Sequence, residues 1–150
     1  MSDLRDLYEE VILDHNRNPR NYPRNPEGSN CHAHGFNPLC GDDVSVYVKV
    51  EDGVIRDVGF DGVGCAIAMA SASLMSEAIK GKSEAEARHL FEQMHTALTN
   101  GGIQEGDTSL GKLAVFAGVR EFPMRVKCAT LAWHVLKAAL DGEEETVCTE

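Results

Sequence analysis

The first part of the chain repeats apolar residues at the spacing of an amphipathic helix. They recur at positions i, i+3, i+4, i+7 and i+8, and they are Leu4, Leu7, Tyr8, Val11 and Ile12. A single face of one helix brings these side chains together, so we expect a first helix here. Ser2 is a suitable N-cap, and Pro19 marks the end of this predicted helix.

A β-hairpin is the next pattern along the chain. Residues 16–39 are rich in proline and glycine and are predicted to form a loop. Beyond them, every second residue from Val44 to Val50 is valine and the residues between are mostly polar, which is typical of a half-buried strand. Asp52-Gly53 favours a type I′ turn, so Val54 to Phe60 is predicted to be the returning strand.

The remainder of the chain has helical patterns. Residues 65–80 are rich in Ala, Met and Ser and end before Gly81, as helices often end before glycine. Ser83 and Glu86 form a capping-box pattern, which predicts a helix that runs to about Leu98. Two further helices are expected, a short one over about 109–117 and a last one over about 126–140.

A short antiparallel sheet followed by helices indicates the α+β fold class, with the helices packed on one face of the sheet. The length of 150 residues is that of a single domain, so we expect one domain over 1–150. Residues 143–150 are largely acidic and are predicted to be a flexible tail that carries Cys148 as an unpaired thiol without function.

Composition narrows the classes of function. The formal net charge of −10 argues against a nucleic-acid partner and favours a partner with positive charge at its docking surface. No apolar run approaches the roughly 18 residues of a membrane span, and the acidic N-terminus does not resemble a secretory signal, so a cytoplasmic location is expected. In that compartment five cysteines favour metal binding or sulfur chemistry over disulfides.

Cys40, Asp42, Cys65 and Cys128 are the candidate metal ligands. Their separations of 2, 23 and 63 residues do not match a zinc finger, so the local chemistry of each residue carries the prediction. Cys40 lies in a proline and glycine turn, whereas Cys65 and Cys128 precede helical patterns, where backbone amides favour a thiolate. Three thiolates and a carboxylate suit either a tetrahedral zinc site or a labile iron–sulfur site.

Other interpretations of these residues remain open. Each cysteine could be a small buried hydrophobic residue, and Asp43 could take the place of Asp42. A second metal-like cluster consists of Cys31, His32 and His34, in a loop that has no rigid element beneath it.

Three segments resemble the cysteine motifs of the NifU/IscU-like family, and the resemblance extends over nearly the whole chain. The segments are Asn37-Pro38-Leu39-Cys40-Gly41-Asp42, Gly62-Val63-Gly64-Cys65-Ala66-Ile67-Ala68 and Arg125-Val126-Lys127-Cys128-Ala129. The sequence is more similar to the SufU branch than to the IscU scaffold branch. Lys127 stands where IscU-type proteins have histidine, residues 121–127 lack their Leu-Pro-Pro-Val-Lys motif, and the chain is longer around 100–117.

The resemblance implies an α+β sandwich that holds Zn²⁺ through Cys40, Asp42, Cys65 and Cys128. It also implies a zinc-dependent sulfurtransferase that accepts persulfide sulfur on Cys40 from a pyridoxal-phosphate-dependent cysteine desulfurase of the SufS type. Arg125 would support docking to that desulfurase, and downstream iron–sulfur assembly proteins would receive the sulfur. The alternative is a scaffold that binds iron or a [2Fe–2S] cluster through the same residues, and a purely structural zinc domain is a weaker interpretation.

Overall fold

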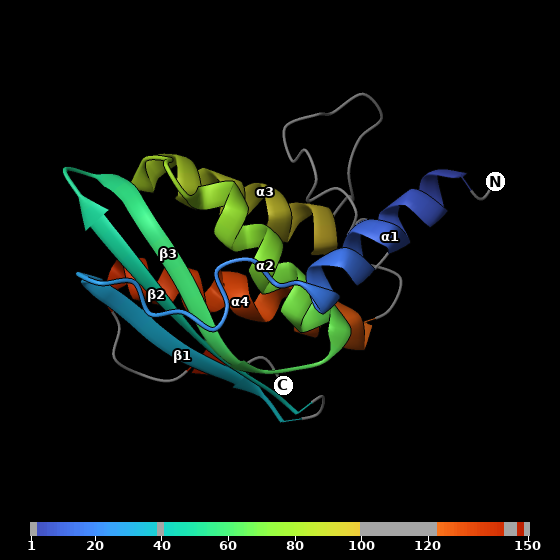
Figure 1. Ribbon diagram of the computed structural model, residues 1–150. Coiled ribbons are helices and arrows are strands. Elements are labelled where there is room, and N and C mark those ends of the chain that lie inside the picture. Colours follow the sequence, from blue (N-terminus) through green and yellow to red (C-terminus); the bar gives the residue numbers. More distant parts are fainter. Residues whose placement is uncertain (1–2, 39–40, 100–122, 143–146, 149–150) are drawn as a thin grey trace.

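The computed structural model describes residues 3–38, 41–99, 123–142 and 147–148, and its helices lie on one face of a twisted sheet (Figure 1). The elements in chain order are α1 (Asp3–Arg17), β1 (Cys31–Asn37), β2 (Asp42–Glu51), β3 (Val54–Val63), α2 (Ala66–Ile79), α3 (Glu84–Thr99), α4 (Pro123–Asp141) and β4 (Val147–Cys148). The predicted α+β class, with helices on one face of the sheet, is confirmed.

The sheet has the strand order β3-β2-β1-β4. β1, β2 and β3 form an antiparallel meander, and β4 adds a short parallel pairing at the outer edge of β1. In the turn between β2 and β3, both Asp52 and Gly53 have positive φ, at 54° and 75°, which confirms the predicted type I′ turn.

The core lies between this sheet and the helices α2 and α4. Val46 of β2 and Phe60 of β3 are direct cross-strand partners with no exposed surface, and Trp133 of α4 is buried with them in one apolar cluster. Burial of each such side chain contributes about 1.5–3 kcal/mol. α1 packs against α2, and α3 packs against α4, so these two helices extend the layer that covers the sheet (Figure 1).

Local signals placed the first three helices well. The hydroxyl of Ser83 accepts a hydrogen bond from the backbone N–H of Glu86 at 3.0 Å, and the Glu86 carboxylate accepts one from the backbone N–H of Ser83 at 3.0 Å. This is the reciprocal bonding of the predicted capping box at the start of α3. α2 ends at Ile79, just before Gly81 with its φ of 88°.

The prediction that residues 16–39 are all loop was wrong, because β1 occupies Cys31–Asn37. The strand's inward positions carry small or polar side chains, so its alternation does not show in hydropathy. α4 begins at Pro123 rather than near Val126, since proline is well suited to the first position of a helix. The predicted helix over 109–117 lies outside the described residues.

The prediction of a flexible tail also fails in part. Val147 and Cys148 pair with Gly35 and Phe36, and these backbone hydrogen bonds give the two residues a fixed place in the sheet. The remaining residues of the tail, 143–146 and 149–150, lie outside the part of the chain that the structure describes.

A segment between α1 and β1 covers the other edge of the sheet. The backbone N–H of Arg24 donates to the carbonyl of Phe60 at 3.0 Å, and the N–H of Phe60 donates to the carbonyl of Asn21 at 3.1 Å. The strap 21–24 therefore occupies hydrogen-bonding groups that an open edge would expose. The close approach requires glycine at position 59, where a Cβ atom would lie 2.3 Å from the carbonyl oxygen of Arg24.

Candidate metal centre

Three of the four predicted ligands meet at one end of the sheet. Asp42 is the first residue of β2, Cys65 is the N-cap of α2, and Cys128 lies in α4. One ligand atom from each residue lies within 4.8 Å of the other two. Cys40 belongs to the connection between β1 and β2 but lies outside the described residues, so its side chain has no place in this geometry.

The two adjacent aspartates have different environments. Asp42 is 1% exposed, and its carboxylate accepts a hydrogen bond of 2.8 Å from the backbone N–H of Cys65. Asp43 points to the opposite face of the sheet, where its side chain is 58% exposed and pairs with His34. Strand alternation therefore directs Asp42 toward the cysteines and Asp43 away from them. Of the two candidates, only Asp42 is near the other ligands.

Glycines bring Cys65 close to Asp42. Gly62 has a φ of 124°, and a Cβ atom there would lie 2.0 Å from the carbonyl oxygen of Asp43. A Cβ atom on Gly64 would lie 3.1 Å from Oδ1 of Asp42. A larger residue at either position would force the end of β3 away from β2. The Gly62-Val63-Gly64 sequence thus permits the short path from β3 into α2.

The backbone at the start of α2 is directed at the sulfur of Cys65. Cys65 has extended dihedral angles, with φ of −67° and ψ of 168°, and its Sγ accepts a hydrogen bond of 3.4 Å from the N–H of Ala68. Its Sγ also lies 3.9 Å from Oδ2 of Asp42. Free N–H groups at a helix N-terminus stabilise negative charge. The predicted position of Cys65 at a helix start is confirmed.

The corresponding prediction for Cys128 was wrong. Because α4 begins at Pro123, Cys128 lies in the second turn, where backbone N–H groups already bond within the helix. Its side chain is 2% exposed and reaches the other ligands through the packing of α4 against the sheet. Tertiary packing, rather than a helix terminus, positions this cysteine.

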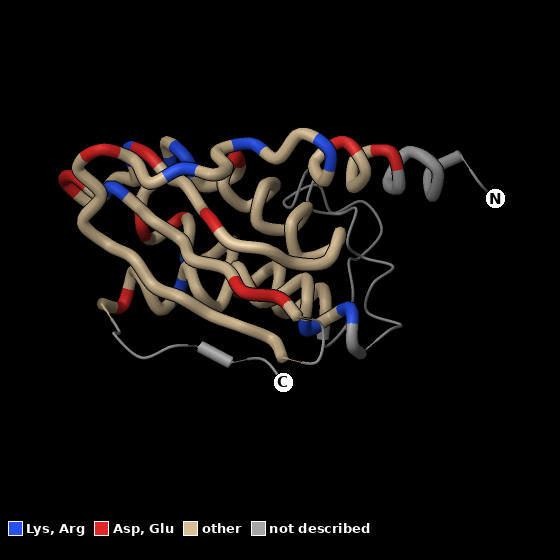
Figure 2. The backbone as a smooth tube through the Cα atoms, turned by 60° about the horizontal axis from the view of Figure 1, so that its bottom comes forward, with Lys and Arg blue, Asp and Glu red and all other residues tan. Residues whose placement is uncertain are grey.

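Two cationic residues precede Cys128 in α4. Arg125 is exposed and Lys127 is half-buried, and both lie within the first turns of the helix. Figure 2 shows basic positions at the start of α4 at the same end of the molecule as the acidic start of β2. Positive charge therefore lies near the three acidic ligands.

The second cluster predicted from the sequence does not assemble. Cys31 faces the helices, whereas His32 stacks on Tyr47 and His34 pairs with Asp43 on the other face of the sheet. Burial, supplemented by the nearby Glu84 carboxylate, raises the pKa of the Cys31 thiol, which disfavours the thiolate that metals bind. Among the described residues, the only group of three or more candidate ligands is Asp42, Cys65 and Cys128.

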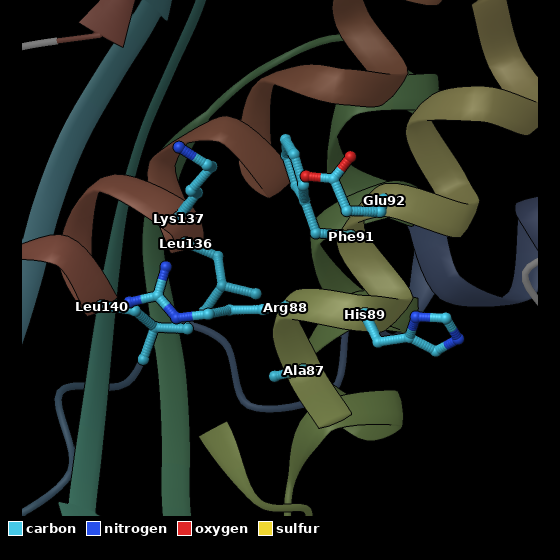
Figure 3. A pocket seen from close by; sticks show the side chains of 8 residues that line it. All are labelled: Ala87, Arg88, His89, Phe91, Glu92, Leu136, Lys137 and Leu140. Atoms are coloured by element: carbon cyan, nitrogen blue, oxygen red, sulfur yellow. The ribbon is translucent and has the colours of Figure 1, made fainter. Parts of the chain in front are cut away.

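A pocket of about 210 Å³ between α3 and α4 is separate from this centre (Figure 3). Phe91 and Leu136 contribute apolar lining, and Arg88 at the pocket is held by an ion pair with Asp141. Lys137 of the lining is nine residues beyond Cys128, a separation of about 14 Å along the helix axis. The pocket contains no cysteine and no member of the ligand group.

Comparison with known protein families identifies the chain. The profile of the NifU-like N-terminal domain matches residues 7–129, a span that includes Cys40, Asp42, Cys65 and Cys128. The chain belongs to this family. Its members act in iron–sulfur cluster assembly, which confirms the resemblance drawn from the three cysteine motifs.

Curated relatives of this NifU-like chain carry two kinds of name. The zinc-dependent sulfurtransferase SufU of Bacillus subtilis is 36% identical over 143 residues, which are 95% of each chain. The iron–sulfur cluster assembly scaffold protein IscU of Streptococcus pyogenes is 37% identical over 140 residues, which are 93% of this chain and 86% of that protein. Sequence identity alone does not separate the two activities.

Solved structures share the fold. A SUF-system scaffold protein from Fervidobacterium islandicum superposes with a TM-score of 0.79 at 36% identity, and the match covers 87% of this chain and 94% of that one. The N-terminal part of a NifU-like protein from Brucella abortus also gives a TM-score of 0.79, at 25% identity over 92% of this chain and 94% of that one. Within the described ranges, no helix is long and apolar enough to cross a membrane.

Proposed function

We propose that this NifU-like protein is a zinc-dependent sulfurtransferase that accepts persulfide sulfur from a pyridoxal-phosphate-dependent cysteine desulfurase of the SufS type. It would pass that sulfur to downstream proteins of iron–sulfur cluster assembly. The observation that carries the proposal is the convergence of Asp42, Cys65 and Cys128 at the end of the turn that contains Cys40. The similarity to the sulfurtransferase SufU of Bacillus subtilis over 95% of both chains supports it.

The residues fit a zinc ion. Two cysteine sulfurs and a carboxylate oxygen within 4.8 Å of one another are donors that zinc prefers, and Cys40 would supply the fourth ligand. A buried carboxylate is costly without a compensating charge, and Asp42 has no ion pair among the described residues. When bound, zinc would keep the coordinating thiols deprotonated and would contribute no redox chemistry.

Cys40 is the proposed sulfur acceptor because of its place in the chain. It lies between β1 and β2 in a connection that contains Pro38 and Gly41, whereas Cys65 and Cys128 belong to the start and interior of helices. A residue on a connection can approach a partner more easily than one inside a packed helix. Gly41 has a φ of 73°, so this turn requires glycine beside the acceptor cysteine.

The proposed transfer is a thiol–disulfide type exchange. The Cys40 thiolate attacks the outer sulfur of the desulfurase persulfide. A new sulfur–sulfur bond forms on Cys40, the bond within the donor persulfide breaks, and the desulfurase cysteine leaves as a thiolate. The terminal sulfur keeps its proton, and neither protein is oxidised or reduced overall. The product is a persulfide on Cys40, ready for a downstream acceptor.

Charge supports docking to a desulfurase. The chain carries a formal net charge of −10, which favours a partner surface with positive charge. Arg125 is exposed at the start of α4, beside the centre, and we assign it a role in orienting that partner. Arg125→Glu should therefore weaken desulfurase binding more than it changes zinc content.

The second candidate function is a scaffold on which a [2Fe–2S] cluster is assembled. The IscU scaffolds, including the one from Thermotoga maritima at 38% identity, favour it. Lys127, next to Cys128, argues against it, because a protonated lysine cannot replace the histidine ligand of the scaffold branch. The same residues could hold iron, so the metal and the sulfur must be measured together.

The deciding experiment measures metal content and sulfur transfer on the same preparation. Protein purified without added iron is assayed for zinc and iron, then incubated with desulfurase and cysteine and weighed by intact mass spectrometry. We expect close to one zinc and a sulfur adduct on Cys40. Cys40→Ser should lose the adduct, whereas Cys31→Ser should keep it, since Cys31 faces the helices away from the centre. A stable iron–sulfur chromophore without an adduct would establish the scaffold function instead.

A further inference from the structure

Asn37 is a buried polar residue at the edge of the proposed metal centre. It is the last residue of β1, has no exposed surface, and is the direct cross-strand partner of Asp42. The inward positions of β1 point toward the helices, so Asn37 and Asp42 occupy the same face of the sheet. The Asn37–Asp42 pair closes the ladder immediately before the turn that contains Cys40.

Other buried polar side chains have roles in joining helices. The hydroxyl of Ser71 in α2 donates to the carbonyl of Ala129 in α4 at 2.6 Å. The hydroxyl of Thr130 donates to the carbonyl of Val126 at 2.9 Å, within α4. Asn37 differs from these residues because it lies on the sheet, at the end where the ligands gather. Burial of an amide costs about 1–3 kcal/mol unless a polar group is there to receive it.

The chemistry of the neighbouring ligands suits an uncharged donor. Two thiolates and a carboxylate place excess negative charge at this end of the sheet, and an amide offers N–H groups without adding charge. The donors to the Asp42 carboxylate among the described residues are the N–H and the thiol of Cys65. The Asn37 amide is therefore available to the sulfur ligands rather than to Asp42.

We propose that Asn37 is a positioning residue whose side-chain amide donates to a cysteine sulfur of the metal centre. This inference rests on the proposed function, because it requires that the centre binds a metal. The hydrogen bond orients the sulfur and withdraws electron density from it, as outer partners do at metal sites. Aspartate at this position would add a negative charge, and leucine would keep the volume but remove the donor.

The test compares Asn37→Leu and Asn37→Asp with the unmodified protein by titration of the apoprotein with Co²⁺ in the presence of a competing chelator. Loss of the donor should weaken Co²⁺ binding by about 10–100-fold, and the added charge of Asn37→Asp should distort the site further. The sulfur-to-cobalt charge-transfer band should move to lower energy in Asn37→Leu, because the sulfur becomes a better electron donor. Asn37→Ser, which keeps a hydroxyl donor, should recover part of the affinity.

A control separates this role from a loss of stability. Val46→Ala truncates a fully buried residue on the same face of β2, remote from the ligands, and should destabilise the fold while leaving the Co²⁺ spectrum unchanged. Unchanged affinity and an unchanged band in Asn37→Leu would overturn the inference alone. If the unmodified protein shows no sulfur-to-cobalt band, the metal centre itself, and with it the proposed function, is wrong.

Discussion

At the scale of single residues, the centre depends on which of two adjacent carboxylates faces inward. Asp42 and Asp43 differ by one position in β2 and therefore occupy opposite faces of the sheet. The sequence motif contains both, and spacing along the chain cannot distinguish them. The register of β1, β2 and β3 decides the matter, since it directs Asp42 toward Cys65 and Cys128.

This pair allows a matched test of the ligand set. Asp42→Asn removes the buried carboxylate charge with almost no change in volume, so zinc affinity should fall by more than the about 10–100-fold expected for an outer partner. Asp43→Asn makes the same chemical change on the exposed face and should leave zinc affinity unaltered. Competition with a chromophoric chelator measures both. Equal affinity in the two variants would remove Asp42 from the ligand set.

At the scale of elements, predictions from local signals were accurate, whereas those that needed tertiary context were not. The β2–β3 hairpin and the start of α3 follow from an Asp-Gly turn and a capping box, which act within a few residues. β1 was missed because its inward side chains are Cys31, Ala33, Gly35 and Asn37, among which only small or polar groups fit against α4. Packing, rather than hydropathy, makes that segment a strand.

The strap 21–24 offers a pH-dependent test of how elements are joined. Arg24 donates two hydrogen bonds to the Asp57 carboxylate on β3, and Lys80 at the end of α2 pairs with it at 3.2 Å. The hydrogen bonds from Arg24, followed by those from Lys80 and the backbone of Val58, hold the pKa of Asp57 far below its usual range. The folded carboxylate therefore resists protonation that the unfolded one accepts near pH 3.9.

Asp57→Asn should lower the free energy of unfolding by about 1–2 kcal/mol at pH 7, where the carboxylate is ionised in both states. Stabilisation of this kind is lost as the pH falls below the unfolded pKa toward the folded one, so the difference between the two proteins should shrink below about pH 4. Urea unfolding at pH 7 and pH 3 measures it. Glu27→Gln, at an exposed position of the same loop, serves as the control. A difference that is the same at both pH values would contradict the electrostatic origin.

At the scale of the whole molecule, the centre joins parts that are distant in sequence. Asp42, Cys65 and Cys128 come from β2, α2 and α4, and the separations of 23 and 63 residues carry no geometric information by themselves. The motifs identified the ligands through family resemblance and local chemistry. Only the packing of α2 and α4 on one face of the sheet shows why these three residues meet.

A metal that binds three elements at once should stabilise the fold as a whole. Zinc at 100 times its dissociation constant would add about 2.7 kcal/mol to the free energy of unfolding. For a chain of this length that corresponds to about 5–10 °C in melting temperature. Removal of zinc by a chelator, followed by calorimetry, should show a decrease of this size, reversed when zinc is restored.

Two variants make the measurement specific to the centre. Cys65→Ser removes a proposed ligand at the start of α2, so its melting temperature should no longer respond to zinc. Asp57→Asn weakens the strap at the opposite edge of the sheet, so it should melt earlier with and without zinc and should keep the full response. A melting temperature of the unmodified protein that ignores the chelator would mean that no metal ties β2, α2 and α4 together.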